Sequence, residues 1–502
     1  MAIRSPEQYL ESLRDGRVVY SEGKRVEDVT RDPLLSKTAN SCAWDYAIAQ
    51  MPEYRDSFVT VDEHGEDVSF VFIPAKSIED LFRRREIIQI LSRICFGTPG
   101  GAKFTGIDAL NSLTVNAKIM DSKMGTQYSD QVEAYRKHLL DTDAALVVGM
   151  TDVKGDRSLR PSQQKQHPDY YVRIVDHTKE HGEDGIVVRG AKMFVSLAAC
   201  ANEIIIMPSR AMTEEDKDYA LAFTCKPDTK GITIITSTEE EFEPENDFEF
   251  PIATTRHSAS GAMIFDDVFI PMDRVFLKGE WQYSANFTYM FANFHRMSGD
   301  AYKYACLEIM AGLGALLAEY NGLEKISHIR DKLAWLALYA EGVEALGKAA
   351  CQFCVTQAGT DLVYPNPTYS NIAKFYFADH FHQAVKILQD IAGGLPAAAF
   401  SAKDYFHPEL RPMIDKYFSG KEGSTAEQRL RAMHLCREIT SSFEGLWTIH
   451  AEGSLAAQRL SLYALGDWEQ YKAAAKRAAR IEDGTEHPIF SNLPEFPQNF
   501  IK

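Results

Sequence analysis

The feature that most constrains the fold of this 502-residue chain is a change in hydrophobic periodicity along it. Apolar residues recur at helical spacing up to about residue 145 and again beyond about residue 285. The stretch between them contains short runs rich in β-branched and apolar residues, which turn clusters separate. This order predicts helices, then an antiparallel β-domain, then helices again.

Each part of this pattern gives a set of expected elements. Helices are expected to begin after the capping residues Ser5 and Ser77, and a small hairpin is expected over 18–26. Strands are expected at 170–175, 185–196, 203–207, 220–225, 232–235, 262–265 and 268–270. Long helices of an antiparallel bundle are expected at 290–321, 324–358, 370–392 and 425–448. We therefore expect an N-terminal mostly helical domain over 1–145, a central β-domain over 146–280 and a C-terminal helix bundle over 281–502.

Charge and cysteine content restrict the class of protein. A formal net charge of −17 argues against nucleic-acid binding, because phosphate contacts need a basic surface. The eight cysteines are scattered without the spacing of a disulfide framework, which is typical of a reducing compartment. The sequence has no secretory signal pattern and no apolar run approaching the roughly 20 residues that span a bilayer. We therefore expect a cytoplasmic protein that does not cross a membrane.

Two groups of residues raise the question of a metal site. Cys351 and Cys354 have the spacing of a metal or redox pair, but they fall within an expected helix and no second pair follows. Buried cysteines of a bundle are the commoner explanation. The acidic run 239–249 is typical of a solvated loop, with a metal site as the minor alternative. We assign no metal ligand.

Several stretches resemble one flavoenzyme superfamily. Tyr9–Arg17, Glu22–Val26 and Asp28–Thr30 are similar to the N-terminal signature of the 4-hydroxyphenylacetate 3-hydroxylase large-component family. Residues 150–157 and 185–192 look closer to 4-hydroxybutyryl-CoA dehydratase, a member of the same superfamily. Matches at 390–395 and 453–454 extend the resemblance over nearly the whole chain. It implies an α+β fold like that of the acyl-CoA dehydrogenases, one FAD per subunit, and a homotetramer or homodimer.

The resemblance also implies where FAD binds, and the residue chemistry agrees. Lys154–Arg157 is a polar turn in which Arg157 can face a pyrophosphate, the alternative being a surface turn with an internal ion pair. Ser196 stands where relatives place a threonine hydroxyl near the flavin ring, the alternative being a buried serine bonded to backbone. A helix start at Gly453 offers backbone N–H groups, although Gly-Ser is also a common helix boundary. The expected FAD cradle is Lys154, Gly155, Asp156, Arg157, Ser196, Gly453, Ser454, Leu455 and Ala456.

The chain departs from the dehydratase at the residues that hold its iron–sulfur cluster. In that branch three cysteines and one histidine bind the cluster. Here His295 matches the histidine, whereas the cysteine positions fall at about Gly100, Phe104 and Tyr302. The catalytic glutamate of relatives falls near Ser260. We therefore expect no iron–sulfur cluster.

The match to the monooxygenase branch is also incomplete. Relatives use an arginine and a tyrosine in the 97–104 segment and a histidine before the 156–157 turn, and these positions hold Gly97, Gly101 and Val148. Oxygen chemistry on a reduced flavin still needs only a dry pocket and a hydrogen-bond donor near the ring. The candidates for such a pocket are His295 and Tyr302 as catalytic residues, seven apart on one helix face, with Gly101, Lys103 and Phe104 lining the substrate site.

Three hypotheses for the function follow. The leading one is an oxygenase component that takes reduced FAD from a separate reductase and hydroxylates a small aromatic substrate, since no Gly-rich NAD(P)H fingerprint is found. The second is a cluster-free flavin-dependent dehydratase or isomerase of acyl-CoA esters. The third is a flavin-binding homologue that has lost activity.

Overall fold

The computed structural model describes residues 3–98, 101–180, 183–237, 245–256, 258–441, 449–479 and 481. Its first part is mainly helical, as predicted. Ser5 and Ser77 both cap helices through reciprocal hydrogen bonds with the residue three positions on. A short hairpin of β3 (Val59–Val61) and β4 (Asp67–Ser69), which the sequence pattern did not indicate, interrupts this part. The helices are α1 (Pro6–Glu11), α2 (Leu35–Gln50), α3 (Pro52–Phe58), α4 (Ile78–Ile94), α5 (Phe104–Met124) and α6 (Tyr128–Thr142).

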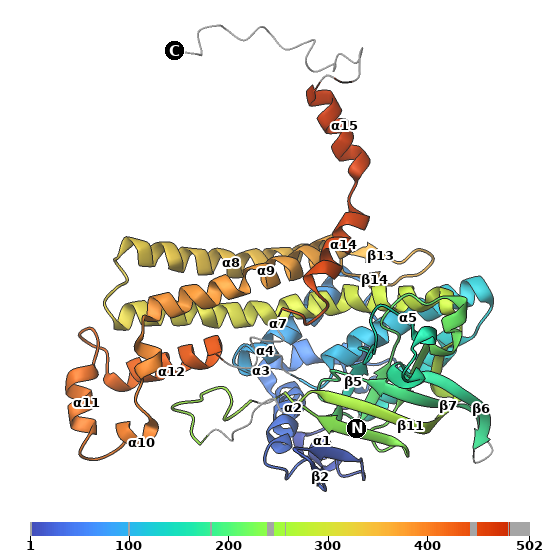
Figure 1. The fold of residues 1–502 in the computed structure, drawn as a ribbon, viewed down its shortest axis with the longest axis horizontal. Coiled ribbons are helices and arrows are strands. Elements are labelled where there is room, and N and C mark those ends of the chain that lie inside the picture. The colour runs from blue at the N-terminus through green and yellow to red at the C-terminus, as the bar shows by residue number, and fades with distance from the viewer. Residues whose placement is uncertain are drawn as a thin grey trace.

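Two sheets pack face to face in the central part of the chain (Figure 1). The larger sheet has the order β2-β1-β10-β11-β7-β6 and the smaller one β12-β9-β8-β5. Phe223 of the smaller sheet meets Phe265 of the larger one edge to face, with ring centroids 5.8 Å apart. The strands are β1 (Val19–Ser21), β2 (Lys24–Val26), β5 (Leu146–Gly149), β6 (Arg173–Glu180), β7 (Glu183–Lys192), β8 (Glu203–Ile206), β9 (Leu221–Cys225), β10 (Ile232–Thr236), β11 (Gly261–Pro271) and β12 (Val275–Lys278).

The sheets differ from the predicted antiparallel pattern in two pairings. β1 pairs with β10, and β5 with β8, in parallel. Both β1 and β5 are distant in sequence from their partners, so no hairpin turn forces them to run antiparallel. The runs predicted at 262–265 and 268–270 form one strand, β11, with a bulge at Asp266 and Asp267.

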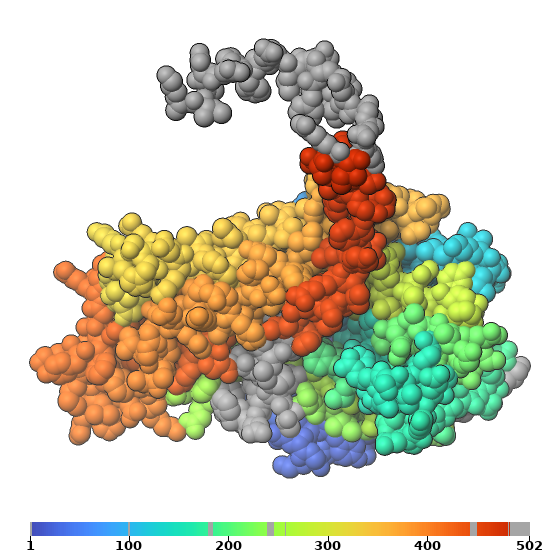
Figure 2. Space-filling view, turned by 45° about the horizontal axis from the view of Figure 1, so that its top comes forward, coloured from blue at the N-terminus to red at the C-terminus, as the bar shows by residue number. Residues whose placement is uncertain are grey.

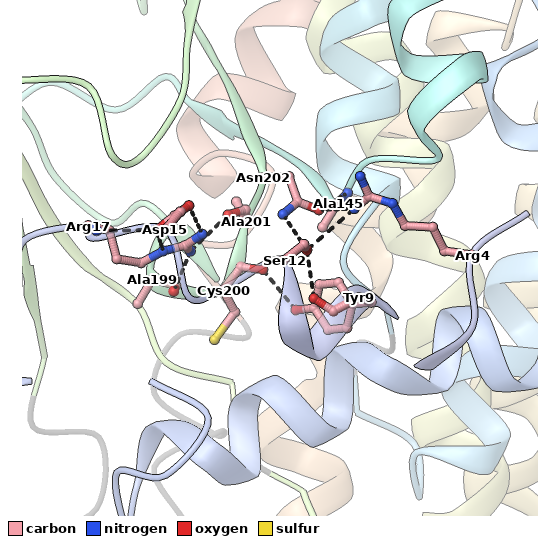
Figure 3. Close-up of polar contacts among 10 residues, drawn as sticks. All are labelled: Arg4, Tyr9, Ser12, Asp15, Arg17, Ala145, Ala199, Cys200, Ala201 and Asn202. Atoms are coloured by element: carbon pink, nitrogen blue, oxygen red, sulfur yellow. Dashed lines mark hydrogen bonds and ion pairs between the residues drawn. The ribbon is translucent and has the colours of Figure 1, made fainter. Parts of the chain in front are cut away.

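The N-terminal segment holds the loop that follows Ser196 in place (Figure 3). The Tyr9 hydroxyl donates to the Cys200 carbonyl oxygen at 2.8 Å. The Arg17 guanidinium donates to the carbonyl oxygens of Ala199 and Ala201, each at 2.8 Å. Residues in and just after α1 thereby fix the backbone of a loop that lies 182 to 191 positions away in sequence.

The C-terminal part contains long antiparallel helices that lie side by side (Figure 1). They are α7 (Ser284–Tyr320), α8 (Ser327–Gln352), α9 (Pro367–Ala392) and the shorter α12 (Ala426–Ser441). The predicted bundle is therefore present, although residues 442–448 of the last predicted helix lie outside the described residues. Two short helices, α10 (Ala402–Tyr405) and α11 (Arg411–Phe418), cap one end, while α14 (Leu455–Leu465) and α15 (Trp468–Ala479) follow the bundle.

Two details of the bundle differ from expectation. Helix α8 ends at Gln352, so Cys354 stands just beyond it, in contrast to the buried Cys351. Helix α7 begins at Ser284, before the predicted start at residue 290, so His295 lies well inside the helix. By composition α7 contains a stretch apolar enough to cross a membrane, with a mean hydropathy of 1.2, but 56% of that stretch is buried inside the structure, as expected for a core helix.

Candidate functional site

His295 of α7 is held between aromatic rings and a buried carboxylate. Its ring stacks on Phe291 with centroids 4.8 Å apart and lies 6.4 Å from the Phe104 ring. His295 Nδ1 is 2.9 Å from Asp108 Oδ2, and the Ser298 hydroxyl donates to Asp108 Oδ1 at 2.8 Å. Burial raises the pKa of Asp108, although these two partners oppose that shift. The carboxylate orients the imidazole, which leaves Nε2 as the ring nitrogen free for chemistry.

Tyr302 lies two turns further along α7 and is tied to Glu452. Its hydroxyl donates to Glu452 Oε1 at 2.6 Å, and the Lys303 ammonium forms an ion pair with the other oxygen of the same carboxylate. Burial and the Glu452 carboxylate raise the pKa of Tyr302 well above its ordinary value. Tyr302 is therefore in its protonated form, and its hydroxyl donates its hydrogen bond to Glu452.

Glu452 occupies a tightly enclosed position. Its backbone is left-handed, with φ +56°, and a Cβ added at Gly299 would stand 2.6 Å from the Glu452 carboxyl carbon. Burial raises the pKa of Glu452, but the charges of Lys303 and Lys374 outweigh it and lower that pKa to about 2. The carboxylate is thus ionised at any physiological pH.

Further charged groups surround this pair. Lys374 donates to the Ile449 carbonyl oxygen at 2.8 Å, and burial together with the charge of Lys303 lowers its pKa to about 7. Arg296 is buried, and its guanidinium lies 3.4 Å from the Glu452 carbonyl oxygen. Asp300 is completely buried, and burial raises its pKa well above the ordinary value. The bundle side of the site is therefore a buried ionic cluster beneath His295 and Tyr302.

The three predicted substrate residues lie on one short segment, but they differ in their surroundings. The Phe104 ring lies between those of His295 and Tyr302, 6.2 Å from the latter. Lys103 points into the helical core, where its ammonium pairs with Asp143 at 2.6 Å and lies over the Tyr46 ring. Gly101, with φ +92°, lies directly against the Asp45 carboxylate. Phe104 alone among the three touches both predicted catalytic residues.

The predicted Gly453–Ala456 segment is joined to the bundle side of the site. Ser454 caps α14, because its hydroxyl accepts a hydrogen bond from the Ala457 N–H. Gly453 has φ +99° and immediately follows Glu452, the partner of Tyr302. This segment and the predicted catalytic pair therefore meet, although they are about 150 residues apart in sequence.

Ser196 lies on the face of the β-region next to a second serine. Its hydroxyl is 2.8 Å from that of Ser260, near which the sequence resemblance places the relatives' glutamate. Ser260 is buried, and Ser196 is half-buried. The predicted ring-facing hydroxyl is thus half of a pair, bonded to a side chain and not to backbone.

The Lys154–Arg157 turn lies on the β-region, where its contacts are with neighbouring residues. Lys154 and Gly155 both have positive φ, and a Cβ added at Gly155 would stand 2.2 Å from the Tyr170 ring. Asp156 accepts hydrogen bonds from the Ser158 N–H and hydroxyl, at 2.9 and 2.7 Å. Arg157 is exposed at the surface of the turn.

The structure adds charged residues that sequence reasoning did not select: Asp108, Lys303, Lys374 and Glu452. Lys303 could have been selected from the sequence, because it is a charged residue inside the apolar stripe of α7. The structure shows that it is fully buried. Glu452 immediately precedes Gly453, which the sequence analysis selected because the backbone N–H groups there could face FAD. No local pattern, in contrast, indicates that Asp108 of α5 faces His295 of α7.

Comparison with known proteins shows one consistent relationship. The N-terminal domain of the 4-hydroxyphenylacetate 3-hydroxylase family matches residues 5–277, and its C-terminal domain matches residues 284–480. The chain is 32% identical to the 4-hydroxybutyryl-CoA dehydratase/vinylacetyl-CoA-Δ-isomerase of Clostridium aminobutyricum, over 96% of this chain and 100% of that protein.

Two solved structures superpose on nearly the whole chain. An oxygen-tolerant archaeal 4-hydroxybutyryl-CoA dehydratase from N. maritimus gives a TM-score of 0.87 at 30% identity, covering 97% of each chain. The oxygenase component of a 4-hydroxyphenylacetate 3-monooxygenase, complexed with FAD and 4-hydroxyphenylacetate, gives 0.86 at 25% identity, covering 95% of this chain and 98% of that one. The predicted α+β fold is confirmed, and the chain belongs to the 4-hydroxyphenylacetate 3-hydroxylase family.

Proposed function

We propose that this protein is the oxygenase component of a two-component flavin monooxygenase, which hydroxylates a small aromatic substrate with reduced FAD and O2. The observation that carries the proposal is the grouping of Phe104, His295 and Tyr302. The sequence resemblance places two cluster-binding cysteines of the dehydratase at about Phe104 and at Tyr302, and here both residues present aromatic rings. Aromatic walls suit the face of an aromatic substrate.

FAD is the proposed cofactor, and the charges on the β-region fit its pyrophosphate. Lys154, Arg157 and Arg210 lie close enough for burial and their mutual repulsion to lower the pKa of Lys154. None of the three forms an ion pair with another residue in the described part of the chain. An anion is therefore the natural partner for this group. When bound, reduced FAD supplies the electrons that activate O2.

The remaining residues take roles that follow from their contacts. The Ser196–Ser260 hydroxyl pair is proposed to hydrogen-bond the flavin ring, and the N–H groups at the start of α14 are proposed to face another part of FAD. His295, oriented by Asp108, is proposed to accept the proton of the substrate hydroxyl at Nε2. Tyr302 is proposed to position the substrate while Glu452 holds its hydroxyl.

Replacing Arg157 by glutamine is expected to weaken FAD binding about tenfold, because one charge-assisted contact to the pyrophosphate is lost. The dissociation constant for FAD, measured by fluorescence quenching, tests this. The control is Lys165→Gln, which removes an exposed cation of the same region. Equal affinities for the Arg157→Gln variant and the wild type would show that the turn does not bind the phosphates.

The function itself is tested with photoreduced FAD under anaerobic conditions. A panel of phenols and phenolic acids is added, followed by O2, and the hydroxylated products are identified by mass spectrometry. The proposal requires a product that depends on both the protein and the substrate. If every substrate gives only hydrogen peroxide, the monooxygenase proposal is wrong.

A second candidate function is a cluster-free dehydratase or isomerase of acyl-CoA esters. The identity of 32% to the Clostridium dehydratase, together with the retained His295, favours it. Calorimetric titration with 4-hydroxybutyryl-CoA and crotonyl-CoA separates the two candidates. An oxygenase for free phenols is expected to bind neither ester.

The proposed partners are a separate flavin reductase and further copies of this chain, within the cytoplasm. The domain boundaries that we propose remain at residues 145 and 280. A homotetramer or homodimer is supported by the C-terminal helices, of which α14 packs against α9 and α15 projects away from the body of the molecule (Figures 1 and 2). No residue of α15 is buried, and Leu460, Tyr463 and Tyr471 are 71%, 68% and 58% exposed. Large exposed apolar side chains on neighbouring surface helices are typical of a surface that a second subunit covers.

The double variant Tyr463→Glu/Tyr471→Glu is expected to reduce the oligomer to a smaller species, because it places charges in a buried interface. Light scattering coupled to gel filtration measures the mass. Glu469→Gln, on α15, serves as the control and is expected to keep the wild-type mass. A monomeric wild-type protein, or a double variant of unchanged mass, would contradict the proposed assembly.

A further inference from the structure

A cavity opens in the N-terminal helical part, directly behind Phe104. It encloses about 520 Å³ of space between atoms, its open mouth included. Most of its wall is apolar, and Phe104, Asp108 and Ser298 connect it to the surroundings of His295. Its lining residues come from α2, α3, α4, α5 and α7, with Ser69 of β4 and Val71 completing the wall. A mostly apolar cavity with a few polar groups is the kind of site in which small organic molecules bind.

Arg84 of α4 is the unusual member of this wall. The residue is only 4% exposed, and one of its terminal nitrogens donates to the Ile73 carbonyl oxygen. Its Nε–H has no hydrogen-bond partner in the described part of the chain, and no described carboxylate lies within ion-pair distance of the guanidinium, although the charges of Asp108 and Asp80 act on it. A buried cation without an acidic partner is expensive, and proteins keep such groups where a ligand completes them.

The other charged groups in the wall have partners already. Lys103 is paired with Asp143 at 2.6 Å. Asp108 accepts hydrogen bonds from His295 and Ser298, and Asp45 accepts one from the Ala102 N–H. Arg84 is therefore the group in this cavity with an unfilled hydrogen-bonding position for a ligand.

We propose that the cavity behind Phe104 binds a small molecule with an apolar body and a single carboxylate, and that Arg84 receives the carboxylate. That this acid is the substrate rests on the proposed function, whereas the binding of the acid in the cavity does not. A carboxylate matches the planar fork of a guanidinium. A doubly charged phosphate fits less well, because Asp45 and Asp108 line the same cavity and only one unpaired cation faces it.

Equilibrium dialysis of the full-length protein with matched pairs of acids and amides tests this proposal. The probes are phenylacetate, 4-hydroxyphenylacetate and 3-phenylpropionate, each compared with its neutral amide at pH 7.5. Amide and acid have the same shape, so the ratio of their affinities reports the charge alone. The wild-type protein is expected to bind at least one acid about tenfold more tightly than its amide, as a charge-assisted hydrogen bond predicts.

Variants of Arg84 assign the preference to this side chain. In Arg84→Met the acid and the amide are expected to bind within about twofold of each other, while Arg84→Lys retains part of the preference. Arg93→Gln is the matched control, since it removes an exposed cation of the same helix and is expected to keep the wild-type ratio. The Lys variant keeps the test valid if the Met variant does not fold.

Two results overturn the inference: a wild-type protein that prefers none of the three acids, or an acid-to-amide ratio that stays at the wild-type value in Arg84→Met or in Arg84→Lys. Dialysis measures binding without turnover. A protein that shows the acid preference but forms no hydroxylated product supports the Arg84 site and contradicts the monooxygenase proposal.

Discussion

Replacing Glu452 by glutamine is expected to destabilise the protein by about 3 kcal/mol, the largest stability effect that we predict for an isosteric exchange in this structure. The carboxylate accepts the Tyr302 hydroxyl and pairs with Lys303, and all three side chains are buried. A neutral amide leaves the Lys303 ammonium desolvated without a counter-charge. Loss of one member of a buried ion pair is among the most destabilising single changes.

The pH dependence of stability gives the same interaction a second signature. The pKa of Glu452 falls from 4.5 to about 2 on folding, because neighbouring lysines outweigh the effect of burial. A group with a lowered pKa in the folded state contributes its full stability above the unfolded value of 4.5 and loses it as the pH falls towards 2. The wild-type protein is therefore expected to lose stability between pH 5 and its acid unfolding, and Glu452→Gln is expected to lack this contribution.

Urea unfolding followed by circular dichroism, at pH 7.5 and at about pH 3.5, measures both effects. The control is Glu308→Gln, which breaks the exposed ion pair with Arg93 and is expected to cost less than about 1 kcal/mol. Adding Lys303→Met to Glu452→Gln is expected to recover part of the loss, since the orphaned cation is removed. If Glu452→Gln costs no more than the Glu308 control, the buried pair does not stabilise the fold.

Much of the architecture followed from local chemistry. Ser5 and Ser77 each precede a residue that closes a capping box three positions later, so their helix starts were readable from short segments. The four long helices of the bundle carry apolar stripes at helical spacing, and burial against neighbouring helices preserves that pattern.

The strand pairings that escaped prediction join segments distant in sequence. β1 pairs with β10 across more than 200 residues, and β5 pairs with β8 at the edge of the smaller sheet. Strands of three or four residues give too short a pattern to reveal such pairings. β11 was predicted as two strands although it is one. The bulge at Asp266 and Asp267 interrupts the alternation of apolar and polar residues, so the single strand looks like two in the sequence.

The candidate site shows the same division between local and distant information. The resemblance to the family selected His295, Tyr302 and the glycine at 453, and the structure brings these three regions together. Sequence alone gave no reason to connect Tyr302 with Glu452, because the two lie 150 residues apart. Arg84 could not be distinguished from Arg83 and Arg85 either, since only the fold shows which of the three lines a cavity.

Replacing His295 by asparagine is expected to lower kcat for hydroxylation about 100-fold while leaving the dissociation constant for FAD unchanged. The imidazole is the group that we propose as general base, and asparagine keeps a polar side chain of similar size without a titratable nitrogen. In a neutral imidazole whose Nδ1–H donates to Asp108, Nε2 is the nitrogen that can accept the substrate proton. The ring is also restrained by stacking on Phe291, which reduces the entropy lost on reaching the reactive geometry.

The loss of hydroxylation in His295→Asn is measured by single-turnover mixing of the reduced-FAD complex with O2, using the phenol that the panel identifies. The quantity compared is the yield of hydroxylated product relative to hydrogen peroxide. Asp108→Asn is expected to cause a comparable loss, because an amide at this position favours the wrong tautomer of His295. His382→Asn removes an exposed histidine of α9 and is expected to behave as the wild type. A His295→Asn variant that keeps kcat within about threefold of the wild type would exclude His295 as the base. If the Asp108→Asn variant alone retains activity, the imidazole acts without help from the carboxylate, and Asp108 serves to hold α5 against α7.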